Sequence, residues 1–155
     1  MANDAPGYEL PLLLFGGFRT LIDELHEELR EQGHSDARPV HGFAMQAIGL
    51  DGATASEVGR RLGVSKQAAG KTIDHLERLG YVARSTDRRD ARRKIVVLTD
   101  DGLDLLRRSA EIFEALQERW ARTLGQKRLS ALESDLRKVV GAHAYRLDAQ
   151  AWFGS

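Results

Sequence analysis

Residues 54–98 of the chain read TASEVGRRLGVSKQAAGKTIDHLERLGYVARSTDRRDARRKIVVL. The segment opens on residues 54–57, TASE, which have the spacing of a capping box: a threonine hydroxyl and a glutamate three positions later satisfy free amides at a helix start. This helix is expected to end at Gly63. Only Val64 separates that glycine from Ser65, another favoured N-cap residue, so a second helix begins at once and runs to Leu79. Two helices joined by so tight a turn predict a helix-turn-helix.

The residue pattern changes after the second helix. Residues 81–84 and 94–98 are rich in β-branched and aromatic side chains, which favours two strands, and the polar segment 85–93 lies between them. A β-hairpin directly after a helix-turn-helix predicts a winged helix, with residues 81–98 as the wing. Six basic residues fall between Arg84 and Lys94, and their mutual repulsion indicates an anionic partner. Asp87 and Asp90 are interpreted as local hydrogen-bond and ion-pair partners that hold the arginines in shape.

Helices are expected on both sides of this segment. Apolar residues recur at helical spacing from Tyr8 to Gln32, and Pro39 is placed like a first-turn proline of a helix reaching about Leu50. Thr99 caps a helix to Trp120 or Leu124, and a last helix spans about residues 126–147. The pair Gly16-Gly17 indicates either a later start of the first helix or close packing there. The fold class is therefore mainly α, of the α+β kind.

The composition of the chain limits the classes of function that it can have. The 155 residues suit one domain, and 23 basic against 23 acidic side chains give a net charge of zero, which by itself argues against nucleic acid. The charge is unevenly placed, however: residues 54–94 carry eleven basic and five acidic side chains, a net charge of +6, and the remainder carries −6. The absence of cysteine excludes disulfides and thiol sensing, and no apolar run suits a membrane span, so a cytoplasmic location is expected.

The second helix of the segment carries side chains suited to reading DNA. An α-helix fits the major groove, and a narrow hairpin can reach the neighbouring minor groove. Gln67 can pair with adenine, and Lys66 or Lys71 can contact guanine or phosphate. The candidate DNA-binding residues are Ser65, Lys66, Gln67, Ala68, Lys71 and Thr72 on the helix, and Arg84, Arg88, Arg89 and Arg92 on the wing.

Two motifs carry a resemblance to a known family. Residues 87–92, DRRDAR, followed by residues 98–102, LTDDG, resemble the wing and next helix start of the MarR family of transcriptional regulators, whose pattern is roughly D-x-R-D-x-R, a short strand, then L-T-x-x-G. The order of elements is similar over about residues 8–147. The resemblance implies one domain over residues 1–155, with a helical dimerisation region (8–32 and 103–148) and a winged helix-turn-helix lobe (39–98).

The resemblance also implies a function. It implies a homodimer that binds a pseudo-palindromic operator, acts as a repressor, and places Arg89 at the wing tip. Family members commonly release DNA when a small, often aromatic molecule binds between the dimer helices and the winged helix. The candidate effector pocket here comprises Phe15, Phe18, Arg19, Ile22, His41 and Met45, and Phe113 is a further candidate. Arg19 and His41 can orient an anion; the alternative is that the apolar members are simply core.

Other classes of function have weaker support. The five histidines are scattered without a recognised metal spacing, so neither a metal nor a cofactor is expected. No phosphate loop, nucleophile elbow or dinucleotide fingerprint is present, so the chain is not expected to be an enzyme, although an Asp/Glu/His site assembled in space remains an alternative. A winged helix that binds protein without a role at DNA is the other alternative, and the six basic wing residues favour DNA over it.

Overall fold

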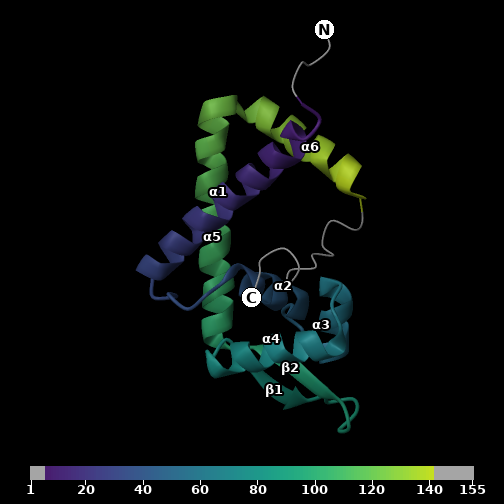
Figure 1. The fold of residues 1–155 in the computed structure, drawn as a ribbon. Coiled ribbons are helices and arrows are strands. Elements are labelled where there is room, and N and C mark those ends of the chain that lie inside the picture. Colours follow the sequence, from purple (N-terminus) through teal and green to yellow (C-terminus); the bar gives the residue numbers. More distant parts are fainter. Residues whose placement is uncertain (1–5, 142–155) are drawn as a thin grey trace.

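The computed structural model describes residues 6–141 and shows a mainly α-helical chain with one two-stranded antiparallel sheet, which confirms the expected fold class. The elements in order are α1 (Glu9–Glu31), α2 (Pro39–Ile48), α3 (Ala55–Leu62), α4 (Lys66–Arg78), β1 (Val82–Thr86), β2 (Lys94–Leu98), α5 (Asp100–Leu124) and α6 (Gln126–Val140). Helices α1, α5 and α6 form an elongated part, and the other elements form a compact lobe at one end of α5 (Figure 1). None of the helices described is long and apolar enough to cross a bilayer.

The helix-turn-helix forms through the capping residues that the sequence indicates. The Thr54 amide donates to Glu57 Oε2 at 2.9 Å, and the Glu57 amide donates to Thr54 Oγ1 at 3.2 Å, which completes the capping box of α3. Gly63 ends this helix with φ +73°, a backbone conformation that only glycine adopts without strain. Ser65 Oγ then accepts the Ala68 amide at 3.0 Å and starts α4. The turn between the two helices is therefore set by local interactions alone.

The wing is a short hairpin fixed to the lobe at its base. Val82 pairs with Leu98 and Thr86 with Lys94, so β1 runs two residues further than the sequence suggests. On the other side of β2, Ala53 and Val96 exchange two backbone hydrogen bonds of 3.0 and 2.8 Å. These bonds attach the sheet to the chain just before α3, while the connecting loop projects from the lobe (Figure 1).

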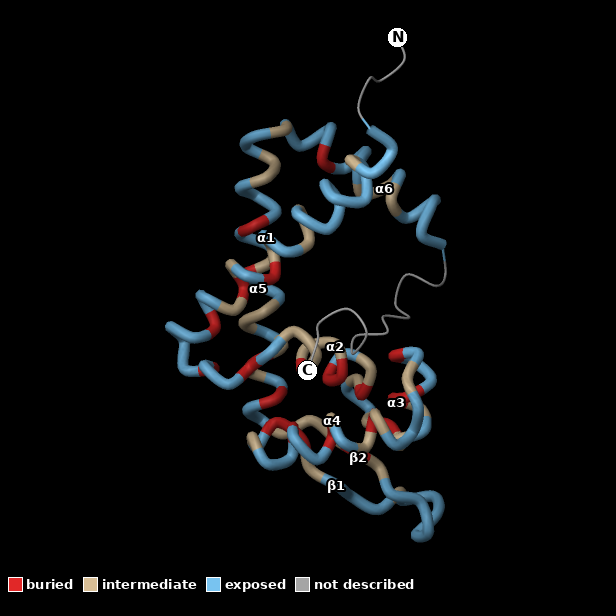
Figure 2. The backbone as a smooth tube through the Cα atoms, viewed as in Figure 1, coloured by how far each residue is buried: buried red, intermediate tan, exposed pale blue. Residues whose placement is uncertain are grey.

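The core lies where the long helices meet the lobe. Leu25 and Leu29 of α1 are buried against it, and Ile73 and Leu76 of α4 are fully buried (Figure 2). Because α4 buries one stripe of apolar residues, its opposite face is left at the surface. Figure 2 shows that the wing and much of the elongated part are exposed.

Three details differ from, or resolve, the sequence-based expectations. Helix α2 ends at Ile48, two residues early, because Gly49 adopts φ +71°. The first helix does begin near Tyr8, and Gly17 serves close packing: a β-carbon there would come within 3.3 Å of the Trp120 indole. Helix α6 is described to Val140, and residues 142–147 of the predicted last helix lie outside the described residues.

Candidate nucleic-acid interface

The exposed face of α4 carries the residues expected to read DNA. Lys66, Gln67 and Lys71 are exposed, and Ser65 lies exposed at the start of the helix. Ala68, by contrast, is half-buried. Thr72 is also half-buried, and its hydroxyl donates to the Ala68 carbonyl oxygen at 3.3 Å. The structure therefore brings the polar candidates together on one surface, with two cations and one amide pointing to solvent.

The wing tip is shaped by its two aspartates. Asp87 Oδ1 accepts the Arg89 amide at 2.9 Å, and Asp90 Oδ1 accepts the Arg92 amide at 3.0 Å. The loop is closed by a hydrogen bond from the Asp87 amide to the Arg93 carbonyl oxygen, also 2.9 Å. Both carboxylates thus act within the loop. The side chains of Arg88, Arg89 and Arg92 are left exposed at its surface.

Arg84 differs from the other wing candidates. Its guanidinium donates to Asp74 Oδ1 at 2.5 Å and to Glu77 Oε1 at 2.8 Å, both on α4. Arg93, which the sequence did not single out, pairs with Glu57 of α3 and lies 3.8 Å from Asp87 Oδ2. Sequence reasoning missed these partners because the alternation of acidic and basic residues indicates pairing without indicating which residues pair.

Together, α4 and the wing form one surface that carries exposed basic side chains. Both lie at the end of the molecule remote from α6 (Figure 1). Several exposed cations of α4 and the wing form no ion pair within the described part of the chain, among them Lys66, Lys71, Arg88, Arg89 and Arg92. A surface with a helix of groove-filling size and several unpaired cations can neutralise phosphates and present side chains to base edges.

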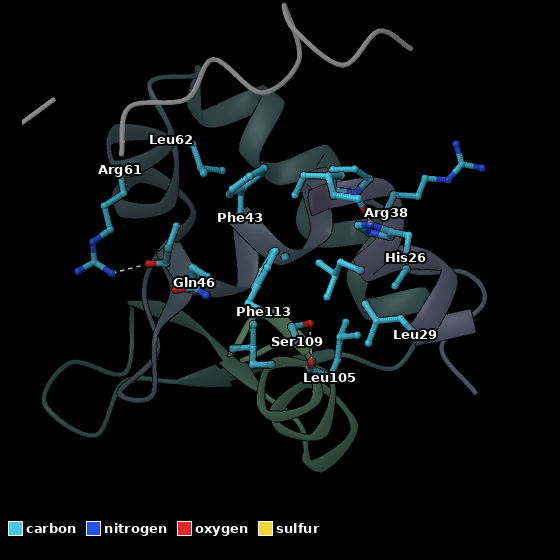
Figure 3. A pocket seen from close by; sticks show the side chains of 17 residues that line it. His26, Leu29, Arg38, Phe43, Gln46, Arg61, Leu62, Leu105, Ser109 and Phe113 are labelled. Atoms are coloured by element: carbon cyan, nitrogen blue, oxygen red, sulfur yellow. Dashed lines mark hydrogen bonds between the residues drawn. The ribbon is translucent and has the colours of Figure 1, made fainter. Parts of the chain in front are cut away.

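A separate cavity of about 430 Å³ lies between the lobe and the long helices (Figure 3). Most of its wall is apolar and comes from α1, α2 and α5, including Leu29, Phe43 and Phe113. Arg38 and Arg61 contribute to the lining, and an Arg61 amino group donates to the Ala47 carbonyl oxygen at 2.6 Å. An apolar cavity with a few polar groups has the character of a small-molecule site.

The cavity differs from the effector pocket suggested by the sequence: of the six main candidates only Ile22 lines it, together with the further candidate Phe113. Met45 is fully buried in the core, and Phe15 and Arg19 are exposed on α1. Phe18 stacks on Phe43, with ring centroids 6.4 Å apart, without itself lining the cavity.

His41 is displaced from the cavity because it holds the start of α2. Its Nδ1 accepts the Arg38 amide at 3.0 Å, and the side chain is buried. Burial, and after it the neighbouring His75, lowers the pKa of His41 to about 4. The ring is therefore neutral at physiological pH and carries no charge with which to orient an anion.

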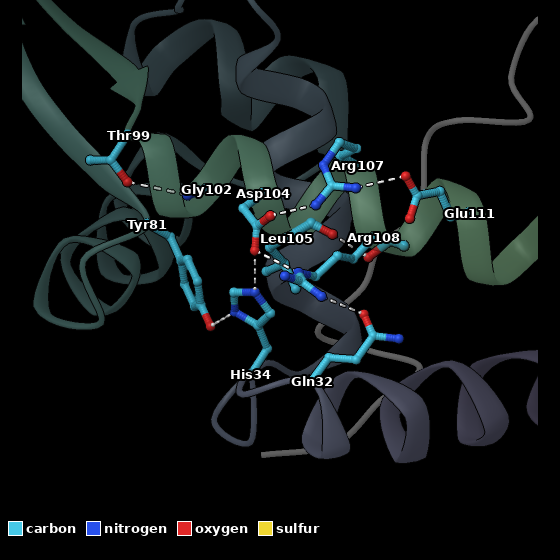
Figure 4. A network of polar contacts seen from close by, with 11 residues as sticks. Gln32, His34, Tyr81, Thr99, Gly102, Asp104, Leu105, Arg107, Arg108 and Glu111 are labelled. Carbon is cyan, nitrogen blue, oxygen red and sulfur yellow. Dashed lines mark hydrogen bonds and ion pairs between the residues drawn. The ribbon is translucent and has the colours of Figure 1, made fainter.

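A polar network joins the lobe to the long helices (Figure 4). His34, buried after α1, lies 2.9 Å from Tyr81 Oη through Nδ1 and 3.0 Å from Asp104 Oδ2 through Nε2. The Arg108 hydrogen bond, followed by those of His34 and Arg107, holds the pKa of Asp104 well below its usual range. Among the described residues, no group of three or more His, Asp or Glu side chains is placed to hold a metal ion.

A helix-turn-helix followed by a basic two-stranded hairpin defines a winged-helix protein. A sequence model of the MarR family matches residues 41–93, which include α3, α4 and most of the wing. Over these residues, about a third of the chain, the sequence is similar to the MarR family.

Comparison with solved structures extends the shared fold over most of the chain. Streptococcus pneumoniae FabT, solved in complex with DNA, superposes with a TM-score of 0.74 at 20% identity, over 86% of this chain and 94% of that one. CouR from Rhodococcus jostii RHA1, solved bound to p-coumaroyl-CoA, gives a TM-score of 0.67 at 18% identity, over 90% and 97% of the two chains.

The matches to curated proteins are local. The HTH-type transcriptional regulator YcgE of Bacillus subtilis is 43% identical over 44 residues, which are 28% of this chain and 29% of YcgE. A riboflavin kinase of Thermoplasma volcanium is 40% identical over 53 residues, 34% of this chain and 23% of the kinase. The chain thus covers less than a third of the length of either of these two curated relatives.

Proposed function

We propose that this protein is a sequence-specific DNA-binding transcriptional regulator. The observation that carries the proposal is the single surface on which α4 and the wing present several unpaired cations. In a complex, α4 lies in the major groove, where Gln67 contacts adenine and Lys66 and Lys71 contact guanine or phosphate. Arg88, Arg89 and Arg92 reach the adjacent minor groove or its phosphates. The FabT complex with DNA supports this arrangement through the shared fold.

We further propose a homodimer on a pseudo-palindromic operator. The supporting observation is apolar surface on the elongated part: Leu10, Leu12 and Leu13 of α1 are each at least 60% exposed, and Val139 of α6 is 80% exposed. So much exposed leucine on one helix is typical of an interface rather than of a solvated face. A two-fold dimer places two copies of α4 about 34–36 Å apart, one turn of DNA. Binding across a promoter represses transcription by excluding the polymerase.

The cavity is proposed as the effector site. Its apolar wall suits an aromatic ring, and Arg38 suits a carboxylate. CouR, solved with p-coumaroyl-CoA, shares the fold and supports an aromatic ligand of this kind. Because the cavity is lined by helices of both the lobe and the elongated part, an occupant favours one relative position of the two and thereby alters the spacing of the α4 pair.

The alternatives have less support. A winged helix that binds only protein gains nothing from unpaired cations on both α4 and the wing. The riboflavin kinase match covers only the 53-residue segment and carries no catalytic function to the remainder of the chain.

Replacing Gln67 with alanine is expected to relax base preference at one position of each half-site, by about 1–3 kcal/mol per contact. Wild-type and variant protein are used to select binding sites from random DNA, and the two sets are sequenced. Gln117→Ala, which changes an exposed glutamine of α5, is the matched control. An unaltered preference in the Gln67 variant contradicts the major-groove assignment. Failure of wild-type protein to enrich any sequence contradicts the proposed function.

Aromatic carboxylates are expected to stabilise the protein against heat, by about 2.7 kcal/mol at a concentration of one hundred times Kd. Loss of the Arg38 contact in Arg38→Gln raises Kd about tenfold and so reduces this stabilisation by about half. The measurement is the shift in Tm over a panel of benzoates and hydroxycinnamates. Arg19→Gln, which removes an arginine outside the cavity, is expected to keep the full shift. Equal shifts in both variants contradict the role of Arg38.

A further inference from the structure

Arg93, just before β2, ties the wing to α3. This side chain donates to Glu57 Oε1 on α3 and lies 3.8 Å from Asp87 Oδ2 at the wing loop. The other oxygen of Glu57 is occupied by the Thr54 amide in the capping box. That hydrogen bond, and the charge of Arg93, hold the pKa of Glu57 below its usual range, so the carboxylate is charged at neutral pH. One glutamate therefore caps α3 and binds the wing.

Arg84 ties β1, the first strand of the wing, to α4. Its two amino groups reach Asp74 and Glu77, which lie three residues apart on α4 and thus face the same side of the helix. Each limb of the hairpin is therefore tied to a different helix: β1 to α4 through Arg84, and the segment before β2 to α3 through Arg93. A two-stranded hairpin has little rigidity of its own, so such ties decide where its tip lies.

The ties connect directly to the tip. Asp87, beside Arg93, also accepts the Arg89 amide, so the position of the Arg89 backbone depends on the same group of side chains. Ion pairs as exposed as these contribute little to the free energy of unfolding. Their effect is on geometry: a wing already in position loses less conformational entropy when it binds.

We propose that Arg84 and Arg93 are positioning residues rather than phosphate contacts, and that Glu57, Asp74 and Glu77 fix the wing relative to α4. The proposal rests on the proposed DNA-binding function and reassigns Arg84 from the sequence-based set of wing contacts. It also assigns a role to three carboxylates that lie close to the path of the DNA. The two arginines balance two of the three negative charges within the protein.

Glu57→Gln separates the proposal from simple electrostatics. The amide oxygen still accepts the Thr54 amide, so the cap of α3 is retained, whereas the charge pair with Arg93 is lost. Removing a negative charge from a DNA-binding surface tightens binding if only the charge matters. If Glu57 positions the wing, affinity for a duplex selected from random DNA falls about tenfold, since two wings per dimer are each weakened about threefold. Tighter or unchanged binding overturns the proposal.

The salt dependence of binding distinguishes Arg93 from a phosphate contact. Each phosphate contact contributes about 0.9 to the slope of log K against log salt, so Arg89→Gln lowers the slope of a dimer by about 1.8. Arg93→Gln is expected to weaken binding about tenfold with the slope unchanged, because a mispositioned wing still carries its free arginines. Arg93→Lys, which keeps a charge opposite Glu57, restores most of the affinity. A slope lowered as in Arg89→Gln overturns the assignment.

Amide hydrogen exchange of the protein without DNA tests the same ties independently of function. In Glu57→Gln, the amides of Asp87 and Arg93, which close the wing loop, are expected to exchange about threefold to fivefold faster than in wild type. The amide of Leu76, in the buried part of α4, serves as an internal reference and is expected to be unchanged. Unchanged exchange at the wing overturns the proposal even if the protein binds DNA. Faster exchange in a protein that binds no DNA supports the ties and refutes only the proposed function.

Discussion

Replacing Gly102 with alanine is expected to lower the free energy of unfolding by about 3 kcal/mol. Gly102 lies in the first turn of α5, where its amide donates to Thr99 Oγ1 at 3.2 Å. A β-carbon at this position would lie 2.2 Å from the Tyr81 carbonyl oxygen. That carbonyl cannot withdraw without cost, because it accepts the Thr99 amide at 3.0 Å and the Tyr81 ring is held by His34. The glycine of the LTDDG motif is therefore required where the start of α5 approaches the Tyr81 backbone, between α4 and β1.

The measurement is chemical denaturation at a fixed protein concentration, since the stability of the proposed dimer depends on concentration. Gly70→Ala is the matched control. Gly70 also lies inside a helix, but nothing comes within 4 Å of a β-carbon built there, so alanine is expected to stabilise the protein by up to about 1 kcal/mol. A Gly102 variant as stable as wild type would show that the junction between β2 and α5 can shift to accommodate a methyl group.

Replacing Arg89 with alanine is expected to weaken binding to a selected DNA duplex about a hundredfold. The side chain is exposed at the wing tip, and its backbone is fixed by Asp87. A charge-assisted contact contributes about 1.5 kcal/mol, and the proposed dimer carries two wings, so about 3 kcal/mol of binding free energy is lost. The slope of log K against log salt is expected to fall by about 1.8 in the same titration.

Arg30→Ala is the control for this substitution, because it removes the same charge from an exposed site on α1. It is expected to leave both the affinity and the salt slope close to wild type. The Arg89 variant should keep the wild-type Tm, since its side chain packs against nothing in the core. A variant that binds as tightly as wild type would place the main wing contact on Arg88 or Arg92 instead.

The sequence determined the order and kind of every described element. Thr54, Ser65 and Thr99 cap helices through hydrogen bonds to residues three positions on, and Gly63 turns the chain between two helices. Such signals involve neighbours within one helical turn, so they can be recognised without knowledge of the fold. The uneven charge distribution was equally visible: a net charge of zero separates into a basic winged-helix segment and an acidic frame.

Tertiary structure alone decided which side chains meet. His41 and Met45 have the residue types of a ligand site. The packing of α2 instead places His41 at the start of the helix and Met45 in the core, and the cavity lies beside Arg38. Arg84 and Arg88 cannot be told apart by composition. Only the crossing of β1 over α4 gives Arg84 two carboxylates and leaves Arg88 exposed. Such contacts depend on the angles between packed elements, which no fixed spacing along the chain encodes.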